Sequence, residues 1–267
     1  SGLRMTVISP AFILSTTAHM YGAHAYTFED GISLLTKRLA QDLDVTYCVD
    51  VKHLSRTVTG STKVNYEVKG SLESTDADVV ICAIPGTLAL RIVSGPTPEE
   101  IQFLKAVKYS SGHILHFGID RSIEPYVRFF SLDVNTSIAA VEAVDQSRSS
   151  STYITRLSIH LAPELVMKLE TGQALGGELP DVLDDLPDDI ARHLDLYDGE
   201  ITHQRIENML PLFYPGYLKE LSAFEQYQAS GKKQIYYTGD YMSPALLGGA
   251  CRSGEEVART IIAAYKG

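Results

Sequence analysis

The C-terminal segment constrains the fold of this chain more than any other part of the sequence. A short run of strand-forming residues over 234–240 ends in Gly-Asp, and paired glycines follow at Gly248-Gly249. Ser253 and Glu256 are spaced as in a capping box, so we expect a helix that starts there and runs over 257–265. A strand, a glycine-containing loop and a helix N-terminus let a backbone approach an anionic ligand closely, although the same order also closes domains that bind nothing.

The first third of the chain predicts one helix and a β-meander. Apolar residues recur at helical spacing over 31–43, which indicates an amphipathic helix. Three extended runs follow, over 47–58, 63–69 and 78–84, with turn residues between them. The last run is continuously apolar, as strands buried on both faces of a parallel sheet are. This pattern favours an α/β fold.

The middle of the chain, from 86 to about 230, has a less regular pattern. Extended runs are expected at 113–119, 127–132, 137–144 and 152–160, and helical runs at 101–107 and 163–171. They predict a second, α+β portion with a mixed sheet. The acidic residues between 178 and 200 lack the spacing of a calcium loop, so a solvated helix start at Pro187-Asp188-Asp189 is the preferred interpretation.

Composition excludes several classes of function. With 267 residues, the chain is long enough for one or two domains with a buried core. Its net charge of −10 argues against a nucleic-acid partner, and it contains no apolar run of the ~20 residues that a membrane-spanning helix needs. The three cysteines are scattered, which favours a reducing cytoplasm and predicts no metal site. The expected partners are therefore small molecules or proteins.

The C-terminal residues also carry a resemblance to a known family. Residues 237–240, followed by 249–258 with the pattern GAxxSGxxxA, resemble the C-terminal signature of the flavin-containing amine oxidoreductases, which include protoporphyrinogen oxidases. The resemblance implies FAD as the cofactor, with Gly239-Asp240 at the flavin ribitol and Gly249 and Ala250 lining the isoalloxazine. A helix N-terminus there would stabilise the negative charge that two-electron reduction places near flavin N1 and O2.

Two further segments are similar to the same family. Residues 28–40, 51–54 and 79–85 match its middle section, and the resemblance implies that Val51 contacts adenine through its backbone. The segment 209–217, rich in proline and aromatic residues, is similar to one that precedes the final strand in protoporphyrinogen-oxidase-like members.

The resemblance implies two domains. Residues 31–85 and 232–267 would form a partial FAD-binding Rossmann-like domain with the β-meander, and residues 1–30 and 86–231 a mixed-sheet substrate domain.

The chain departs from the family pattern at the nucleotide end. No GxGxxG occurs, so the loop that holds the FAD pyrophosphate is missing. Three explanations stay open: the chain is a fragment, a second chain supplies the dinucleotide-binding half, or the protein works without FAD.

The substrate side also departs from the pattern of amine oxidation. Leu246 stands where many amine-oxidising members place an aromatic-cage tyrosine, and 113–121 lacks the lysine of their matching strand. Dehydrogenation of a small or lipophilic substrate at a C–C or ring C–N bond is therefore favoured over amine oxidation. Hydride transfer in such enzymes depends mainly on positioning, so no catalytic residue is assigned.

Other candidates for chemistry are weaker. His113 and His116 should point to opposite faces of one strand, so each is expected to be a packing or hydrogen-bonded histidine rather than a metal ligand. Cys251 is expected to be a packing residue. Three functions stay open: an FAD-dependent oxidoreductase, a cofactor-free binding module derived from that fold, and an interaction subunit. The substrate, the electron acceptor and the oligomeric state are not specified by the sequence.

Overall fold

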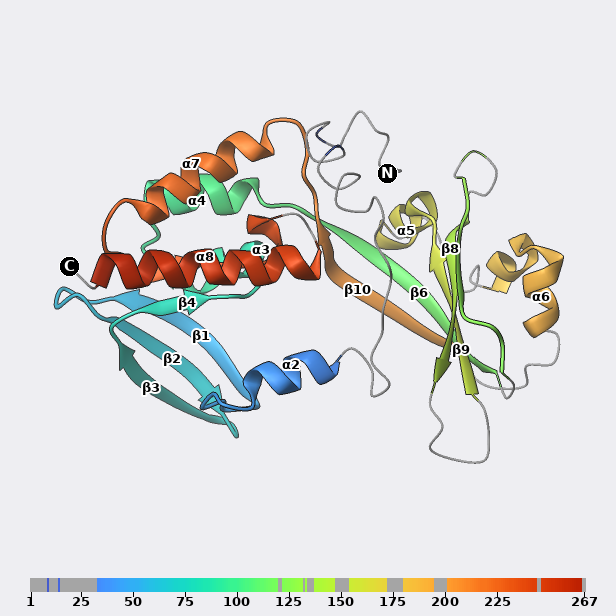
Figure 1. The fold of residues 1–267 in the computed structure, drawn as a ribbon, viewed down its shortest axis with the longest axis horizontal. Coiled ribbons are helices and arrows are strands. Elements are labelled where there is room, and N and C mark those ends of the chain that lie inside the picture. Colours follow the sequence, from blue (N-terminus) through green and yellow to red (C-terminus); the bar gives the residue numbers. More distant parts are fainter. Residues whose placement is uncertain are drawn as a thin grey trace. The chain divides into compact units, whose positions relative to one another are not determined.

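The computed structural model describes residues 9, 14, 33–119, 122–131, 133, 137–146, 154–171, 180–194, 201–243 and 246–265. The chain forms two compact units of mixed α/β structure, which confirms the predicted class (Figure 1). Of the described residues, those within 35–110 and 210–265 belong to the meander unit, and those within 111–209 belong to the five-stranded unit. In this division, 86–110 and 210–231 belong to the meander unit, and the predicted division into an FAD-binding portion and a substrate domain stays a prediction.

The β-meander forms, with a third strand that the sequence pattern did not predict. After helix α2 (Ser33–Ala40), strands β1 (Val49–Arg56), β2 (Thr62–Val68) and β3 (Ser71–Ala77) pair antiparallel in sequence order. Lys69 and Gly70 have positive φ angles of 52° and 80°, so the chain reverses at once after β2. The third strand was expected at 78–84; it lies earlier because β3 is a polar edge strand that shows no apolar run.

The apolar run at 78–84 instead forms a short strand in another sheet. Strand β4 (Val80–Cys82) pairs parallel with β11 (Ile235–Tyr237), in the register Ile235 to Val80 and Tyr237 to Cys82. The expectation that this run is buried on both faces is wrong for the described residues, because Ile81 is 50% exposed. Strand β5 (Val93–Ser94) joins the meander sheet beside β1.

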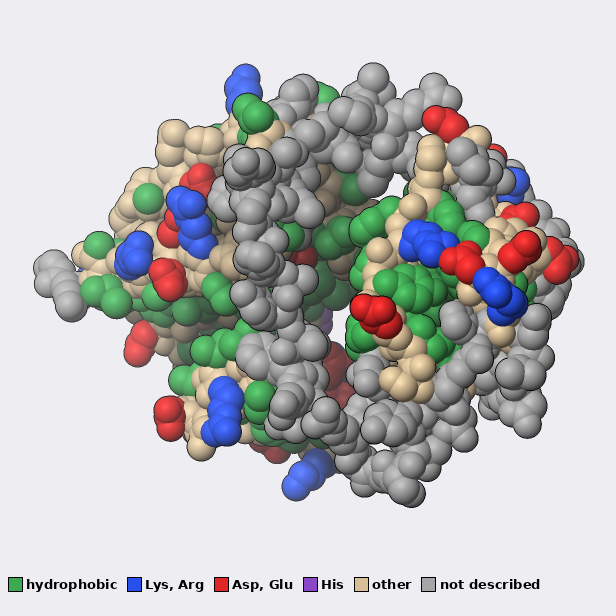
Figure 2. All heavy atoms as spheres, turned by 45° about the vertical axis from the view of Figure 1, so that its right-hand side comes forward, with side chains coloured by type: hydrophobic (Ala, Val, Ile, Leu, Met, Phe, Trp, Pro, Cys, Tyr) green, Lys and Arg blue, Asp and Glu red, His purple; other side chains and the backbone are tan. Residues whose placement is uncertain are grey.

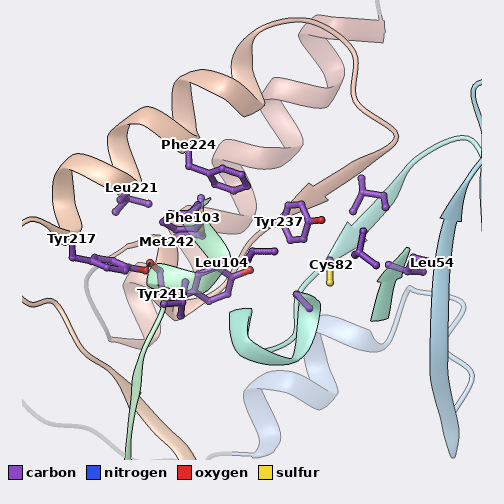
Figure 3. Close-up of a cluster of buried hydrophobic side chains, with 14 of the residues drawn as sticks. Leu54, Cys82, Phe103, Leu104, Tyr217, Leu221, Phe224, Tyr237, Tyr241 and Met242 are labelled. Carbon is purple, nitrogen blue, oxygen red and sulfur yellow. Dashed lines mark hydrogen bonds between the residues drawn. The ribbon is translucent and has the colours of Figure 1, made fainter. Parts of the chain in front are cut away.

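Helices α3 (Gly86–Ile92), α4 (Pro98–Ala106), α7 (Tyr217–Ala229) and α8 (Leu247–Tyr265) complete the meander unit. Its core is aromatic (Figure 3): Phe103 of α4 stacks on Phe224 of α7 at a ring-centroid distance of 4.3 Å, and Tyr217 packs edge-on against Phe213. Helix α4 begins with a complete capping box between Thr97 and Glu100.

The last helix starts earlier than predicted. Helix α8 begins at Leu247, so Ser253 lies inside it and is not its N-cap. Glu256 does not close a capping box either, because its carboxylate accepts from Nε of Arg252 at 2.8 Å, one turn earlier. The pattern Ser-x-x-Glu therefore occurs here within a helix.

The five-stranded unit contains the sheet β10-β6-β9-β8-β7. Its strands are β6 (Tyr109–Ile119), β7 (Tyr126–Phe129), β8 (Ile138–Gln146), β9 (Ile154–Leu161) and β10 (Thr202–Pro211). Helix α5 (Pro163–Glu170), the 3₁₀ helix η3 (Pro180–Asp185) and α6 (Asp188–Leu194) supply Val166, Leu186 and Ile190 to the core on one face of this sheet. The predicted helix start at Pro187-Asp188-Asp189 is confirmed. Among the described residues, no helix is long and apolar enough to cross a membrane.

Candidate functional site

The candidate site begins where the chain leaves the buried strand β11. Gly239 follows that strand with a φ of 149°, a conformation that side chains rarely adopt. A Cβ atom at this position would lie 2.8 Å from Cε1 of Tyr241, so a larger residue would displace that ring. Gly239 therefore sets the turn that carries Asp240 out of the strand into the short helix η4 (Asp240–Met242).

Ser253 ties helix α8 to this turn. Its hydroxyl lies 2.7 Å from Oγ1 of Thr238 and accepts a hydrogen bond from the amide of Gly239 at 3.3 Å. The side chain is buried, at 3% exposure. Ser253, which the sequence pattern presents as a helix cap, instead fastens the interior of α8 to the end of β11.

The first turn of α8, which precedes the turn that carries Ser253, presents backbone donors. The amide of Ala250 donates to the carbonyl of Leu246 at 3.0 Å. The amides before it have no carbonyl one turn earlier within the helix, and the positive end of the helix dipole favours negative charge there. Gly249 and Ala250, which were predicted to line a flavin, both belong to this first turn.

Asp240 presents a half-buried carboxyl beside a half-buried phenol. The hydroxyl of Tyr109 donates to Oδ1 of Asp240 at 3.4 Å, and the amide of Gly86 donates to the Tyr109 oxygen at 3.3 Å. Burial raises the pKa of both the Asp240 carboxyl and the Tyr109 hydroxyl, so the phenol stays a donor at neutral pH. Tyr109 and Gly86 were not predicted as site residues, since only the folded chain brings them to Asp240.

Val51 lies on β1, in a different sheet of the meander unit from β11. The β1–β2 register shifts between Val51 and His53, which marks a bulge. Val51 packs against the aromatic core, and β5 pairs with β1 only at Leu54 and Ser55. A bulge beside a partly covered strand edge is consistent with a backbone that contacts a ligand, but the role of Val51 stays a prediction.

This set of groups fits the flavin end of FAD. The Asp240 carboxylate is an acceptor suited to ribitol hydroxyls, and the first-turn amides of α8 are donors suited to the flavin pyrimidine edge. For the pyrophosphate end of FAD, this sequence supplies no matching group, because it contains no GxGxxG loop.

The histidines of β6 are hydrogen-bonded on opposite faces of the five-stranded sheet, as predicted. Nδ1 of His113 lies 2.8 Å from Nε2 of His203, and its Nε2 lies 2.9 Å from Glu170. His116 lies between Ser158 and Gln204, at 2.9 Å from each. Each imidazole thus has protein partners at both nitrogens.

A cavity of about 490 Å³ lies between α7 and α8 in the meander unit. Its lining combines apolar residues such as Leu221 and Val257 with Glu225 and Glu256. Ser253 also lines it, whereas Asp240 and the first turn of α8 do not, so this cavity is distinct from the candidate site.

Solved structures share the fold at low sequence identity. A protein assigned as a protoporphyrinogen oxidase from Exiguobacterium sp. 255-15 matches with a TM-score of 0.62 and 18% identity, over 90% of this chain and 52% of that one. Cyclohexylamine oxidase from Brevibacterium oxydans IH-35A matches with a TM-score of 0.59 and 12% identity, over 86% and 52%. A fatty acid isomerase from P. acnes that produces CLA matches with a TM-score of 0.56 and 12% identity, over 88% and 53%.

The chain thus spans about half the length of these structures. No curated protein sequence matches it. The model of the family described as flavin containing amine oxidoreductase matches residues 8–262, which is nearly the whole chain. The chain therefore belongs to the flavin-containing amine oxidoreductase family.

Proposed function

We propose that this chain supplies the flavin end of the cofactor site in an FAD-dependent oxidoreductase. The observation that carries the proposal is the junction made by Ser253, which fastens the second turn of α8 to Thr238 and Gly239, the residues that lead into Asp240. A carboxylate acceptor and a set of helix N-terminal donors are together what the ribitol and the flavin ring require. Membership of the family supports FAD as the cofactor.

Each site residue has a proposed role. Asp240 binds the ribitol hydroxyls, and Gly239 holds it in place. Gly249 and Ala250 line the isoalloxazine from the first turn of α8, and Val51 binds adenine through its backbone. When bound, FAD supplies the acceptor for a hydride.

The proposed substrate is small or lipophilic and loses hydrogen at a C–C or ring C–N bond. Leu246, 45% exposed beside the start of α8, offers no aromatic face to an amine. Strand β6, which we propose belongs to the substrate domain, carries no lysine. Structures of this fold are named for amine and non-amine substrates alike, so the fold itself permits either chemistry.

The dinucleotide-binding half is proposed to come from a GxGxxG segment, in the same polypeptide or in a second chain. The meander unit then forms the rest of the FAD-binding domain. The three cysteines, Cys48, Cys82 and Cys251, are free, which supports a working location in the reducing cytoplasm.

The test is reconstitution with FAD and the complementary GxGxxG-containing half. We expect a yellow complex with stoichiometric flavin. Asp240→Ala should weaken FAD binding about tenfold to hundredfold, because a hydrogen bond to a charged group contributes about 1.5–3 kcal/mol. Asp76→Ala, on the exposed strand β3, is the matched control and should bind FAD like the wild type. Absence of bound flavin in the reconstituted complex would overturn the proposal.

The cavity between α7 and α8 favours a second candidate, a cofactor-free binding module. That function predicts that the chain alone binds a lipophilic ligand there, and that FAD does not bind even after reconstitution. The third candidate, an interaction subunit, predicts a stable partner protein recovered from native extract and no small-molecule ligand. The three candidate functions are distinguished by the flavin content of the reconstituted complex and by titration of the chain alone with a lipophilic ligand.

A further inference from the structure

The two faces of the five-stranded sheet differ in character. Phe117, Leu157 and Ile159 are at most 1% exposed and belong to the core under α5, η3 and α6. Because side chains alternate along a strand, their neighbours in sequence lie on the opposite face. We call that opposite surface the polar face; its described residues are Ile114, His116, Gly118, Val127, Phe129, Ala140, Glu142, Val144, Arg156, Ser158 and His160.

Strand register arranges this face in rows. One row holds Gly118, Arg156 and Val144 on neighbouring strands β6, β9 and β8. The next row holds His116, Ser158, Glu142 and Val127, and the third holds Ile114, His160, Ala140 and Phe129. Arg156 thus lies between a glycine without a side chain and a valine, neither of which can pair with it.

The other polar side chains of this face have partners. Ser158 and Gln204 bind His116, and Nε2 of His160 lies 3.7 Å from Glu142. Arg156 differs: its Nε is buried without a hydrogen-bond partner, and no ion pair joins it to a carboxylate among the described residues. A buried guanidinium nitrogen without an acceptor is costly, so an anion at this position would be strongly stabilised.

The same face also offers an apolar surface, which lies on β7, two strands away from Arg156. Val127 and Phe129 on β7 are 57% and 81% exposed. Strand β7 is two strands away from β9, and Val127 and Phe129 lie one and two rows along the strands from Arg156, which puts them roughly 12 and 17 Å away at the usual strand spacing and rise. An extended aliphatic chain bound at Arg156 therefore passes over β8 before it reaches Val127.

We propose that Arg156 is a carboxylate-binding residue, and that the polar face takes an amphipathic carboxylate whose apolar part lies over Val127 and Phe129. A guanidinium binds a carboxylate through two parallel N–H bonds, and Nε is one of the donors that this geometry uses. Gly118, the cross-strand neighbour of Arg156 on β6, is exposed and has no side chain. This assignment names a substrate class and rests on the proposed oxidoreductase function.

The test is a titration of the 267-residue chain with octanoate, octylamine and octan-1-ol. Octanoate should bind most tightly and should shift the ¹H–¹⁵N signal of the Arg156 Nε–H group. Arg156→Gln should weaken octanoate binding by about tenfold to hundredfold, because a charge-assisted pair is lost, and should leave octan-1-ol binding unchanged. Arg156→Lys keeps the charge without the planar guanidinium. Its octanoate affinity should lie between those of the wild type and Arg156→Gln.

Arg128→Gln is the matched control. Arg128 belongs to the same sheet but pairs with Asp189 of α6 on the opposite face, so its loss should not change octanoate affinity. Equal octanoate affinity in the wild type and Arg156→Gln, or an unmoved Nε–H signal at saturation, would overturn the assignment. If Arg156→Gln does not fold, the wild-type signal carries the test alone. No measurement here uses FAD, so its outcome is independent of flavin reconstitution.

Discussion

At the scale of single residues, the buried tyrosines around β11 differ in whether their hydroxyl groups have partners. Tyr217 donates to the carbonyl of Tyr241 at 2.8 Å, whereas the hydroxyl of Tyr241 itself is buried with no partner among the described residues. Both rings are fully buried, so they contribute similar apolar area to the core. The two hydroxyls therefore affect stability in opposite directions.

Tyr241→Phe should leave the free energy of unfolding unchanged or raise it by up to about 1 kcal/mol, because it removes an unsatisfied buried hydroxyl. Tyr217→Phe should lower it by about 1–2 kcal/mol, since the Tyr241 carbonyl loses its donor. Urea unfolding of the two variants against the wild type measures both effects. A larger loss of stability in Tyr241→Phe than in Tyr217→Phe would contradict this account.

Glu170 makes a pH-dependent contribution to stability. Arg205, and then His113, hold the pKa of its carboxyl at about 2, against an ordinary value of 4.5. The ionised carboxylate therefore stabilises the fold above pH 4.5, and this contribution is lost as the pH falls from 4.5 towards 2. Between pH 4.5 and 2, the free energy of unfolding of Glu170→Gln should depend less on pH than that of the wild type.

Urea unfolding at a series of pH values checks the Glu170 prediction. Glu164→Gln, on the exposed side of α5, is the control and should keep the wild-type pH dependence. If the free energy of unfolding of Glu170→Gln changes with pH as steeply as that of the wild type, then the pairing with Arg205 does not persist in solution.

At the scale of elements, local patterns predicted the type of most helices and strands but not the sites that depend on distant contacts. The runs that form β6 to β9, α4 and α5 lie in the less regular middle of the chain, yet their residues still predict the right type of element. Strand β3 was missed because it is polar and exposed, and α7 and β10 lay in a segment where no regular pattern was recognised. The start of α8 was misplaced, because Gly248-Gly249 disfavours a helix locally.

The candidate site shows the same limit. Gly239, Asp240, Gly249 and Ala250 were found because they are close in sequence and form a motif. Tyr109 pairs with Asp240 across 131 positions, so nothing local to either residue signals the contact.

The link between α8 and β11 gives a test at this scale. Ser253→Ala should lower the free energy of unfolding by about 1–3 kcal/mol, because the Gly239 amide and the Thr238 hydroxyl lose a buried partner. In the reconstituted complex the same variant should also bind FAD more weakly, since α8 is no longer fastened to the end of β11. Ser222→Ala, at an exposed position of α7, is the control for both the unfolding and the FAD measurements. Wild-type stability in Ser253→Ala would show that other contacts fix α8.

At the scale of the whole molecule, apolar side chains lie at the surface beside charged ones (Figure 2). Several belong to α2, β4 or α8 or directly adjoin them: Leu39, Leu43, Ile81, Ile84, Leu246, Leu247 and Ile262. None of the residues of α2 is buried, although its sequence predicts an amphipathic helix. Under the proposed function, the complementary half that carries the GxGxxG segment covers part of this surface.

This arrangement predicts that the 267-residue chain alone associates with itself as its concentration rises. Analytical ultracentrifugation should show an increasing average mass, and addition of the complementary half with FAD should convert the mixture to one defined complex. Ile81→Thr should weaken self-association, because it removes an exposed apolar side chain from β4 while keeping a β-branched residue in the strand. Val58→Thr, at a fully exposed position beyond β1, is the control and should associate like the wild type. A constant monomer mass at all concentrations would mean that the exposed apolar residues do not form an interface.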